Sequence, residues 1–503
     1  MMKYETLDQA LAAMDKFQQT KSAYDHALGM IGMDAMTAAP HNSWEGRGKT
    51  MEIMSGITYE LETNPENDQW LTCLEAHLDE LDPVRRRQVE LIRKNYDKTN
   101  KIPAEEYIDY SVLLNDAQSV WEKAKNQNDF AMFAPYLDRI VSYNRKFAHY
   151  YNSELPPYDA LLNEYEEGMT METLDAFFAQ LRESTVPLLA KIQAAAPVDD
   201  SFLQKFCSVE DQRKFSDYLM DVMGLDRGYC AIAESEHPFT QNFNNKDVRI
   251  TTHYYENNLA SSMYSVIHEG GHALYELGAD DIYNYTALMG GVSMGMHESQ
   301  SRFYENIIGR SESFVHAIFP KVKELFPAQM DGVDEYMFHR AINKAEPSLI
   351  RTEADELTYA THVMIRYEIE KQLIGGTLDV KDVPREWNRL YKEYLGIDVP
   401  SDTMGCLQDS HWSGGAIGYF PSYALGSAYG AQMLHVMQEQ IGDIWEDVAR
   451  GDLSRITAWL KENIHRHASF KKPGELFEEV CGKFDAKYFT DYLTEKYTKL
   501  YNL

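Results

Sequence analysis

Amphipathic helical periodicity runs through most of this 503-residue chain and limits the folds that it can adopt. Apolar residues recur at intervals of three and four, and Asp, Asn or Pro often stands between segments, where helices begin or end. We expect helices at 3–30, 46–63, 67–98, 103–127, 129–152, 170–196, 210–223, 258–278, 296–308, 312–325, 331–343, 353–374, 385–396, 421–441, 443–450, 453–464 and 473–500. Strand-like alternation is confined to 237–240 and 247–253. The pattern predicts an all-α fold with very small β content.

The connections between these helices are short and contain no repeat, low-complexity block or Pro/Ser-rich linker. Weak breaks near 154–160 and 197–202 are typical of loops. An apolar fraction of 44% is enough for a large core. We therefore predict one large helical domain over residues 1–503, which a cleft can divide into two lobes.

Charge and cysteine content limit the partners and the compartment. The net charge of −31 excludes a broad basic surface, so neither nucleic acid nor an anionic membrane is expected as a partner. The five scattered cysteines include no CxxC pair, which favours free thiols in a reducing compartment. The N-terminal segment has no apolar signal core, and no apolar run is long enough for a membrane span. We expect a soluble, cytoplasmic protein.

Residues 268–272 read His-Glu-Gly-Gly-His, the HExxH pattern, inside a predicted helix. Residues four apart share one face of a helix, so His268 and His272 can bind the same Zn²⁺. Glu269 then lies beside the metal, where its carboxylate can deprotonate a water molecule. The apolar residues of the segment fall on the opposite face. A helix that packs by one face and presents His and Glu on the other is typical of a metal site.

Two glycines inside the motif also need an explanation. Gly270 and Gly271 each cost about 1 kcal/mol of helix stability. We therefore expect a close approach to the helix backbone at this point, by a substrate or by a second strand.

A catalytic zinc site needs a third protein ligand and one open position. The candidates are Glu276, Glu298, Glu305 and His297. Glu298 follows His272 by 26 residues and begins a new helical segment after a Gly-rich turn, so a neighbouring helix can present its carboxylate. We expect Glu298 to be the ligand and Glu276 to support a ligand from behind.

Three further clusters combine polar and aromatic residues near glycine: 350–355, 405–412 and 418–423. Taken alone, each is more typical of turns and core packing than of a site. The same holds for the segment His-Pro-Phe at 237–239.

Together with HExxH, these clusters form an ordered set of motifs: HPF (237–239), DxRxT (247–251), HExxH (268–272), HESQ (297–300), IRxxAD (350–355) and GxxQDxHW (405–412). All six motifs appear in order, and with them the chain resembles the carboxypeptidase Taq family of zinc metallocarboxypeptidases; the resemblance covers essentially the whole chain. One departure lies near the N-terminus, where Met33 precedes Asp-x-x-Thr and relatives tend to have Trp. That segment is far from HExxH in sequence.

The resemblance implies an almost wholly helical, saddle-like fold with a deep groove, similar to neurolysin and angiotensin-converting enzyme. It also implies a homodimer with one Zn²⁺ per subunit, held by His268, His272 and Glu298, for which other divalent metals such as Co²⁺ can substitute. Such enzymes remove single residues from peptide C-termini with broad preference and act poorly on a terminal Pro.

The expected mechanism is metal-assisted hydrolysis. Zinc polarises the scissile carbonyl, and Glu269 moves a proton from water to the leaving amine. Tyr419 is expected to stabilise the oxyanion, since Tyr-Phe-x-Ser resembles the matching stretch of angiotensin-converting enzyme. Tyr423 and His411 are the alternatives. Arg351 is the leading candidate to bind the free carboxylate of the substrate through two hydrogen bonds.

Other candidate substrate-binding residues come from the same motifs: His237, Asp247, Arg249, Gln408 and Asp409. We expect 247–251 to form an edge strand that pairs with the substrate backbone. Two other functions stay open. One is a zinc oligopeptidase or endopeptidase without a carboxylate clamp. The other is a non-catalytic peptide-binding zinc protein, although a purely structural site would close its fourth position with another ligand.

Overall fold

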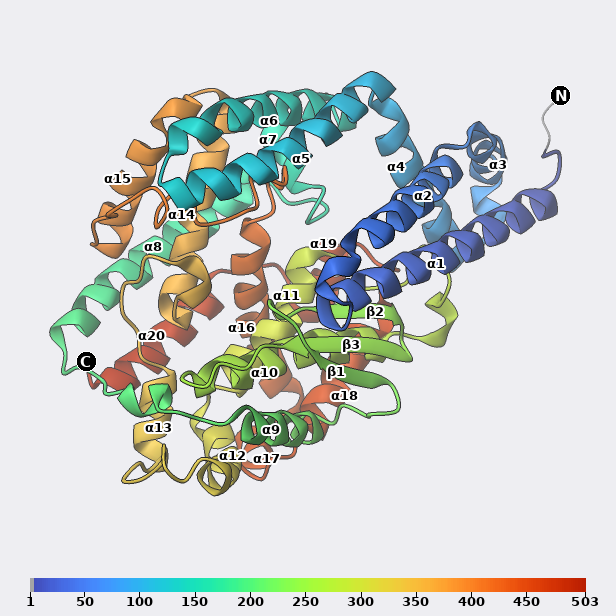
Figure 1. The fold of residues 1–503 in the computed structure, drawn as a ribbon. Coiled ribbons are helices and arrows are strands. Elements are labelled where there is room, and N and C mark those ends of the chain that lie inside the picture. The colour runs from blue at the N-terminus through green and yellow to red at the C-terminus, as the bar shows by residue number, and fades with distance from the viewer. Residues whose placement is uncertain (1–3) are drawn as a thin grey trace.

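The structure is a computed structural model that describes residues 4–503, so the expected helix start at residue 3 lies outside it. Helices hold 69% of the residues and strands 3%, which confirms the all-α prediction (Figure 1). The first helices are α1 (Leu7–Thr37), α2 (Trp44–Thr63), α3 (Pro65–Glu75), α4 (Pro83–Lys101), α5 (Ala104–Gln127), α6 (Phe130–Tyr151), α7 (Pro157–Leu162), α8 (Met171–Ala194), α9 (Val209–Val222) and α10 (Leu259–Gly278). The others are α11 (Met294–Arg302), α12 (Glu312–Leu325), α13 (Glu335–Ile342), α14 (Glu356–Gly375), α15 (Val383–Leu395), α16 (Pro421–Ile441), α17 (Trp445–Ala449), α18 (Ser454–Asn463), α19 (Pro473–Cys481) and α20 (Lys487–Tyr501).

Two of the expected helices are each a pair of helices. The segment 67–98 divides because Asp82 caps the start of α4, accepting hydrogen bonds from the backbone N–H groups of Val84 and Arg85. Pro83 then occupies the first turn of α4, where its missing N–H costs nothing. The segment 473–500 divides between α19 and α20, and Gly482 follows α19 with a φ of +73°.

A small three-stranded sheet contains β1 (Cys230–Glu234), β2 (Thr240–Asn244) and β3 (Asp247–Thr252), in the order β1-β3-β2. The strand expected at 247–253 is confirmed as β3, whereas 237–240 only reaches the first residue of β2 and β1 was missed. β3 pairs with β1 in parallel and with β2 in antiparallel orientation. The expectation that 247–251 forms an edge strand was therefore wrong, because both backbone edges of β3 are already paired.

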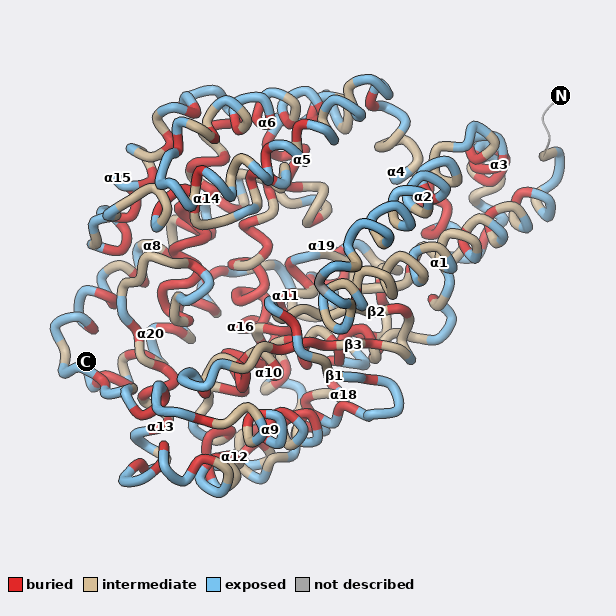
Figure 2. The backbone as a smooth tube through the Cα atoms, in the orientation of Figure 1, coloured by how far each residue is buried: buried red, intermediate tan, exposed pale blue. Residues whose placement is uncertain are grey.

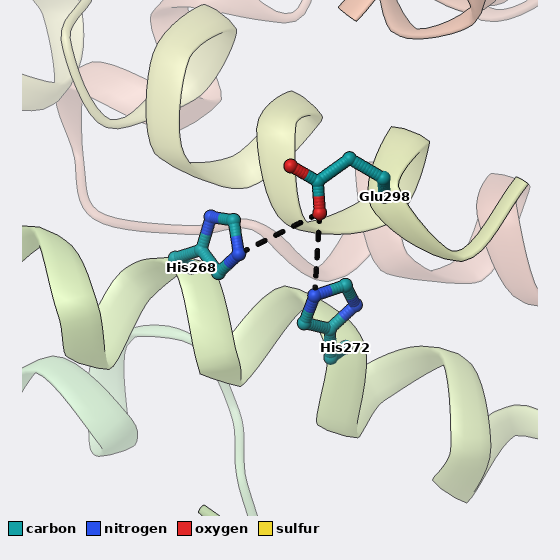
Figure 3. Close-up of side chains that lie close together, drawn as sticks. All are labelled: His268, His272 and Glu298. Carbon is teal, nitrogen blue, oxygen red and sulfur yellow. Dashed lines mark ion pairs between the residues drawn. The ribbon is translucent and has the colours of Figure 1, made fainter. Parts of the chain in front are cut away.

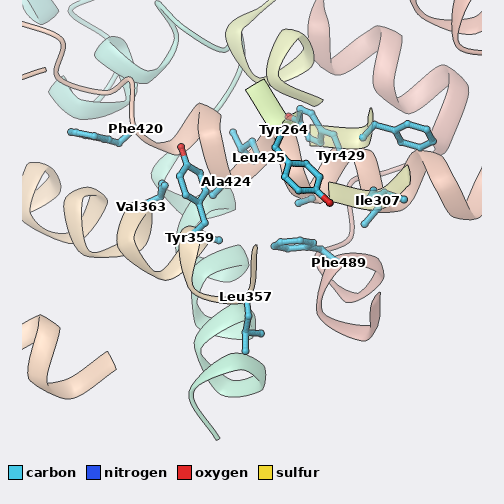
Figure 4. Close-up of a cluster of buried hydrophobic side chains, with 14 of the residues drawn as sticks. Tyr264, Ile307, Leu357, Tyr359, Val363, Phe420, Ala424, Leu425, Tyr429 and Phe489 are labelled. Atoms are coloured by element: carbon cyan, nitrogen blue, oxygen red, sulfur yellow. The ribbon is translucent and has the colours of Figure 1, made fainter. Parts of the chain in front are cut away.

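The hydrophobic core extends from α5 to the C-terminal helix, and the N-terminal helices α1, α3 and α4 enclose a second, smaller cluster around Met14, Trp70 and Leu74. Figure 2 shows buried backbone concentrated around α10, α11, α14 and α16. Part of this core is rich in tyrosine and phenylalanine, including Tyr264 and Phe489 (Figure 4). Across residues 4–503, every helix is too short or too polar to span a lipid bilayer.

Candidate metal centre

The two histidines of HExxH lie one turn apart on α10, and Glu298 on α11 faces both of them (Figure 3). Oε2 of Glu298 is 3.7 Å from Nε2 of His268 and 3.6 Å from Nε2 of His272. Ligand atoms about 2.1 Å from a tetrahedral zinc stand about 3.4 Å from one another. Among the described residues, these three are the group whose ligand atoms converge in this way. The spacing and the donor types therefore fit a divalent metal.

The opposite ring nitrogens of both histidines are already hydrogen-bonded. Nδ1 of His268 is 2.8 Å from Oε2 of Glu305, and Nδ1 of His272 is 2.6 Å from Nδ1 of His297. Nε2 of His297 in turn lies 2.6 Å from Oε1 of Glu276. If each Nδ1 of the two motif histidines carries the proton, each Nε2 lone pair is free for a metal.

The other three candidate ligands therefore lie outside the converging group and contact the histidines or one another. Glu305 contacts His268, His297 contacts His272, and Glu276 contacts His297. Glu276 also accepts hydrogen bonds from the Asn242 side chain and the Gly291 backbone. These contacts fix ring orientation, and the HExxH pattern alone gave no indication of the partner of each ring.

The carboxylate of Glu298 is held in its ionised form by its neighbours. Burial acts to raise the pKa of Glu298, but the charge of Arg302, with those of the two histidines, outweighs it and lowers the pKa well below its usual range. Arg302 Nε donates to Oε1 at 2.7 Å, and the Ser301 hydroxyl donates to Oε2 at 3.0 Å. An ionised carboxylate is the form that binds a metal.

Glycines let α11 approach its neighbours closely enough to present Glu298. A Cβ atom at Gly271 would lie 2.6 Å from the backbone oxygen of Gln300 and 2.8 Å from Cα of Ser301. A Cβ atom at Gly426 on α16 would lie 2.7 Å from Cβ of Glu298. The expected close approach to the HExxH backbone is thus present, but the approaching segment is helix α11 and not a strand or substrate. Gly270 instead faces the flexible side chain of Met223.

The two glycines give a matched pair for testing this arrangement. Gly271→Ala should force the α11 backbone away from α10 and lower metal affinity by at least about tenfold, because steric overlap with backbone cannot relax cheaply. Gly270→Ala meets only side-chain atoms and gains about 1 kcal/mol of helix propensity, so its metal affinity should stay near that of the wild type. Competition with a chelator measures both affinities. Equal affinities for the two variants would contradict the role of Gly271.

Glu269 is 6% exposed and lies next to the sheet. Its Oε2 accepts a 2.6 Å hydrogen bond from the hydroxyl of Thr240, the first residue of β2. Burial raises the pKa of Glu269, although His268 and Thr240 act in the opposite direction. A raised pKa suits a carboxylate that must accept a proton and then release it. Sequence reasoning missed Thr240, whose one signal was its position directly after the HPF motif.

The candidate oxyanion donors form one aromatic cluster. Nε2 of His411 is 3.2 Å from the Tyr423 hydroxyl, and the Tyr419 and Tyr423 rings are 5.1 Å apart. Burial raises the pKa of Tyr419, and the charge of Glu298 adds to the increase. Burial and the charge of Arg351 lower the pKa of His411 to about 4. At neutral pH the tyrosine is therefore a proton donor and the histidine is uncharged.

Arg351 belongs to a buried cluster with an unbalanced charge. It is 5% exposed, and its Nε and Nη2 donate to Oδ1 of Asp409 at 3.0 and 2.9 Å. The other oxygen of Asp409 pairs with Arg366 at 2.6 Å, while Gln408 Oε1 accepts from the backbone N–H of Arg351 and from Nη2 of Arg366. Two guanidinium groups thus share one carboxylate. Within these ion pairs one of the two positive charges has no carboxylate of its own, and the Arg351 guanidinium lies 5.0 Å from the Tyr423 ring.

The remaining candidates lie on or beside the sheet. Arg249 and Asp247 on β3 form a two-point ion pair, with both N···O distances at 2.9 Å. The Arg249 guanidinium also lies 4.9 Å from the Phe243 ring. The backbone oxygen of His237 accepts from the Ser235 hydroxyl at 2.7 Å. The charge of Arg249 is therefore already balanced, unlike that of the Arg351 cluster.

Known proteins match this chain over nearly its full length. The profile of a family described as Carboxypeptidase Taq (M32) metallopeptidase matches residues 13–497. Carboxypeptidase 1 of Bacillus subtilis is 40% identical over 484 residues, which cover 96% of this chain and 97% of that protein. Thermostable carboxypeptidase 1 of Thermus thermophilus is 35% identical over 498 residues, which cover 96% of this chain and 97% of that protein.

Solved structures agree with the sequence matches. The M32 carboxypeptidase from Deinococcus radiodurans has a TM-score of 0.95 at 35% identity, covering 98% of this chain and 100% of that one. The carboxypeptidase of Pyrococcus furiosus has a TM-score of 0.94 at 35% identity, covering 98% and 99%. The resemblance drawn from the motifs is thereby confirmed. Identity at this level over nearly the whole chain shows that the protein belongs to the carboxypeptidase Taq family and is a metallocarboxypeptidase.

Proposed function

We propose that this protein uses zinc to release single residues from the C-termini of peptides, with broad preference and poor action on a terminal Pro. The observation that carries the proposal is the convergence of two imidazole nitrogens on one carboxylate oxygen, from which they lie 3.7 and 3.6 Å away. Two His and one Glu leave a fourth coordination position open, as in catalytic zinc sites. Co²⁺ accepts the same ligands and should substitute.

The proposed ligands are His268, His272 and Glu298. When bound, zinc would supply a Lewis acid that makes water acidic enough to lose a proton near neutral pH and that polarises the scissile carbonyl. Glu269 takes that proton and delivers it to the leaving amine. Its burial supports the role, since a carboxylate in an apolar setting holds a proton more readily.

Tyr419 is proposed to donate a hydrogen bond to the oxyanion. Its raised pKa keeps the hydroxyl protonated, and the influence of Glu298 on that pKa is consistent with a position close to the metal ligands. Tyr423 and His411 remain the alternatives, because their side chains contact each other within the same aromatic cluster.

Arg351 is proposed to bind the terminal carboxylate of the substrate, with Asp409 holding its guanidinium and Gln408 accepting a hydrogen bond from its backbone N–H. The surplus positive charge shared by Arg351 and Arg366 supports this role, because an anion entering the cluster would neutralise it. Arg249 is the next candidate, but Asp247 already balances its charge.

The same charge argument separates the proposal from its rivals. An oligopeptidase or endopeptidase needs the zinc chemistry but has no use for a buried surplus cation at the end of its binding site. A non-catalytic peptide-binding zinc protein needs neither the surplus cation nor Glu269. We therefore favour the exopeptidase.

Assembly and location are proposed from the family resemblance. We infer that the protein is a homodimer and acts in the cytoplasm. Each subunit forms one domain over residues 1–503, with two lobes beside the groove. The net charge of −31 supports neither nucleic acid nor an anionic membrane as a partner. Light scattering of the purified protein measures the subunit number directly, and a monomeric mass would contradict the dimer.

Metal analysis tests the proposed site. The purified protein should contain about one divalent metal per chain, and a chelator should remove metal and activity together. Glu298→Ala should weaken metal binding by at least about tenfold, because it removes a ligand and leaves two histidines. Glu312→Ala, an exposed change at the start of α12, is the matched control. Wild-type affinity in Glu298→Ala would redirect the search to Glu276, His297 or Glu305.

A further inference from the structure

The fully buried carboxylate of Glu370, on α14, takes no part in the proposed hydrolysis. Glu370 is 0% exposed, and its carboxylate accepts three hydrogen bonds from uncharged donors. Trp412 Nε1 donates to Oε1 at 2.8 Å. The Tyr158 hydroxyl and the Gly418 backbone N–H both donate to Oε2, each at 2.8 Å.

These donors belong to the segments that surround the candidate oxyanion donors. Trp412 follows His411 directly, and Gly418 directly precedes Tyr419. Glu370 therefore binds both ends of the loop 412–418. The third donor, Tyr158, lies on α7 and holds that helix to the same carboxylate.

Packing around Gly418 reinforces this connection. Gly418 has a φ of +95°, and a Cβ atom there would lie 3.1 Å from the backbone carbon of Leu161 on α7. Beyond the end of α7, the Tyr165 ring lies 5.2 Å from that of Tyr419. The loop, α7 and the tyrosine thus form one packed unit around the Glu370 carboxylate.

We propose that Glu370 is a positioning residue, which fixes the loop 412–418 so that Tyr419 and His411 keep the orientation needed for catalysis. This inference rests on the proposed function, in which one of the Tyr419–His411–Tyr423 cluster stabilises the oxyanion. Glu370 itself touches neither the metal ligands nor the substrate-binding candidates through any hydrogen bond of the described residues.

A carboxylate is required at position 370 because hydrogen-bond donors face both of its oxygens. A carboxylate accepts at both oxygens, whereas a glutamine side chain has one accepting oxygen and one donating nitrogen. In either amide orientation, the nitrogen of Glu370→Gln would face a donor: Trp412 in one and Gly418 in the other. Burial raises the pKa of Glu370 to about 7, and the hydrogen bonds from Gly418, Trp412 and Tyr158 act in the opposite direction because they favour the ionised carboxylate.

Steady-state kinetics of metal-loaded variants test the proposal. Glu370→Gln should lower kcat by about 30- to 100-fold and change KM by less than about threefold, since misplacement of about 1 Å costs on the order of 100-fold. Metal content should equal that of the wild type. A kcat within about threefold of the wild type would overturn the proposal.

Two double variants distinguish a positioning role of Glu370 from a purely structural one. Adding Trp412→Phe to Glu370→Gln removes the one donor that residues 4–503 give to Oε1, so the amide nitrogen no longer faces an N–H group. This double variant should recover at least about tenfold in kcat over Glu370→Gln. Adding Tyr158→Phe instead should give no recovery, because the Gly418 N–H still donates to Oε2. Equal recovery, or none in either, would overturn the proposal.

Two further measurements keep this inference separate from the role of Tyr419. Tyr419→Phe with wild-type kcat would contradict the proposed oxyanion donor, whereas the loop is tested by amide hydrogen exchange of residues 412–418. Exchange should be faster in Glu370→Gln and slower again after addition of Trp412→Phe. Unchanged exchange would overturn the positioning role. If Glu370→Gln does not fold, the double variant carries the test, and its failure to fold would also contradict the account.

Discussion

Replacing Glu269 with glutamine should lower kcat by about 10²- to 10⁴-fold while the protein stays folded and keeps its metal. The carboxamide has the shape of the carboxylate but cannot accept the proton from water. Its oxygen can still accept the hydrogen bond from Thr240, so the side chain should stay in place. The adjacent proposed ligand His268 keeps its own partner, Glu305, and the metal site should be undisturbed.

Turnover and metal content must be measured on the same preparation of this variant. The expected result is full metal content with almost no product release. Glu269→Asp is a useful companion, since it keeps the base but moves it away by one methylene, and it should retain more activity than the glutamine variant. If Glu269→Gln kept more than about a tenth of wild-type kcat, Glu269 would not be the general base.

Amidating the C-terminus of a good substrate should reduce kcat/KM by about 30- to 1,000-fold, which corresponds to about 2–4 kcal/mol. Amidation deletes the terminal charge and leaves the scissile bond intact. A buried cluster with two arginines and one aspartate has a surplus positive charge, and the amide cannot neutralise it. The loss should therefore appear mainly in recognition of the chain end.

Arg351→Ala should produce a similar loss with the free acid and little further loss with the amide, because both changes remove the same interaction. The four values of kcat/KM form a double-mutant cycle. The competing explanation is that Arg351 only braces the fold through Asp409 and Tyr359, to which it is hydrogen-bonded. In that case the two losses would add, and Arg249 would become the next candidate.

Local sequence patterns predicted which three side chains converge at this candidate metal site. The four-residue spacing of His268 and His272 determines their shared helix face, and the structure places Glu298 opposite them on the next helix. The glycine at 271 even indicated a close approach, although a helix makes it and not a strand. Each of these features depends on spacing within one or two adjacent helices.

The features that were missed depend on contacts between distant segments. Glu370 bonds to Tyr158, which lies 212 positions away, and the position of β3 in the sheet depends on a strand that was not predicted. Thr240 meets Glu269 only because β2 lies beside α10. The periodicity of a single segment carries no information about contacts with distant segments, so these pairings became known only from the tertiary structure.

The most direct test of the central claim is time-resolved mass spectrometry of one unmodified peptide, incubated with metal-loaded protein and with chelator-treated protein. The account predicts a ladder of products that differ by single C-terminal residues, formed only when the metal is present and slowed at a terminal Pro. Internal fragments, or the same ladder from fully metal-free protein, would contradict it.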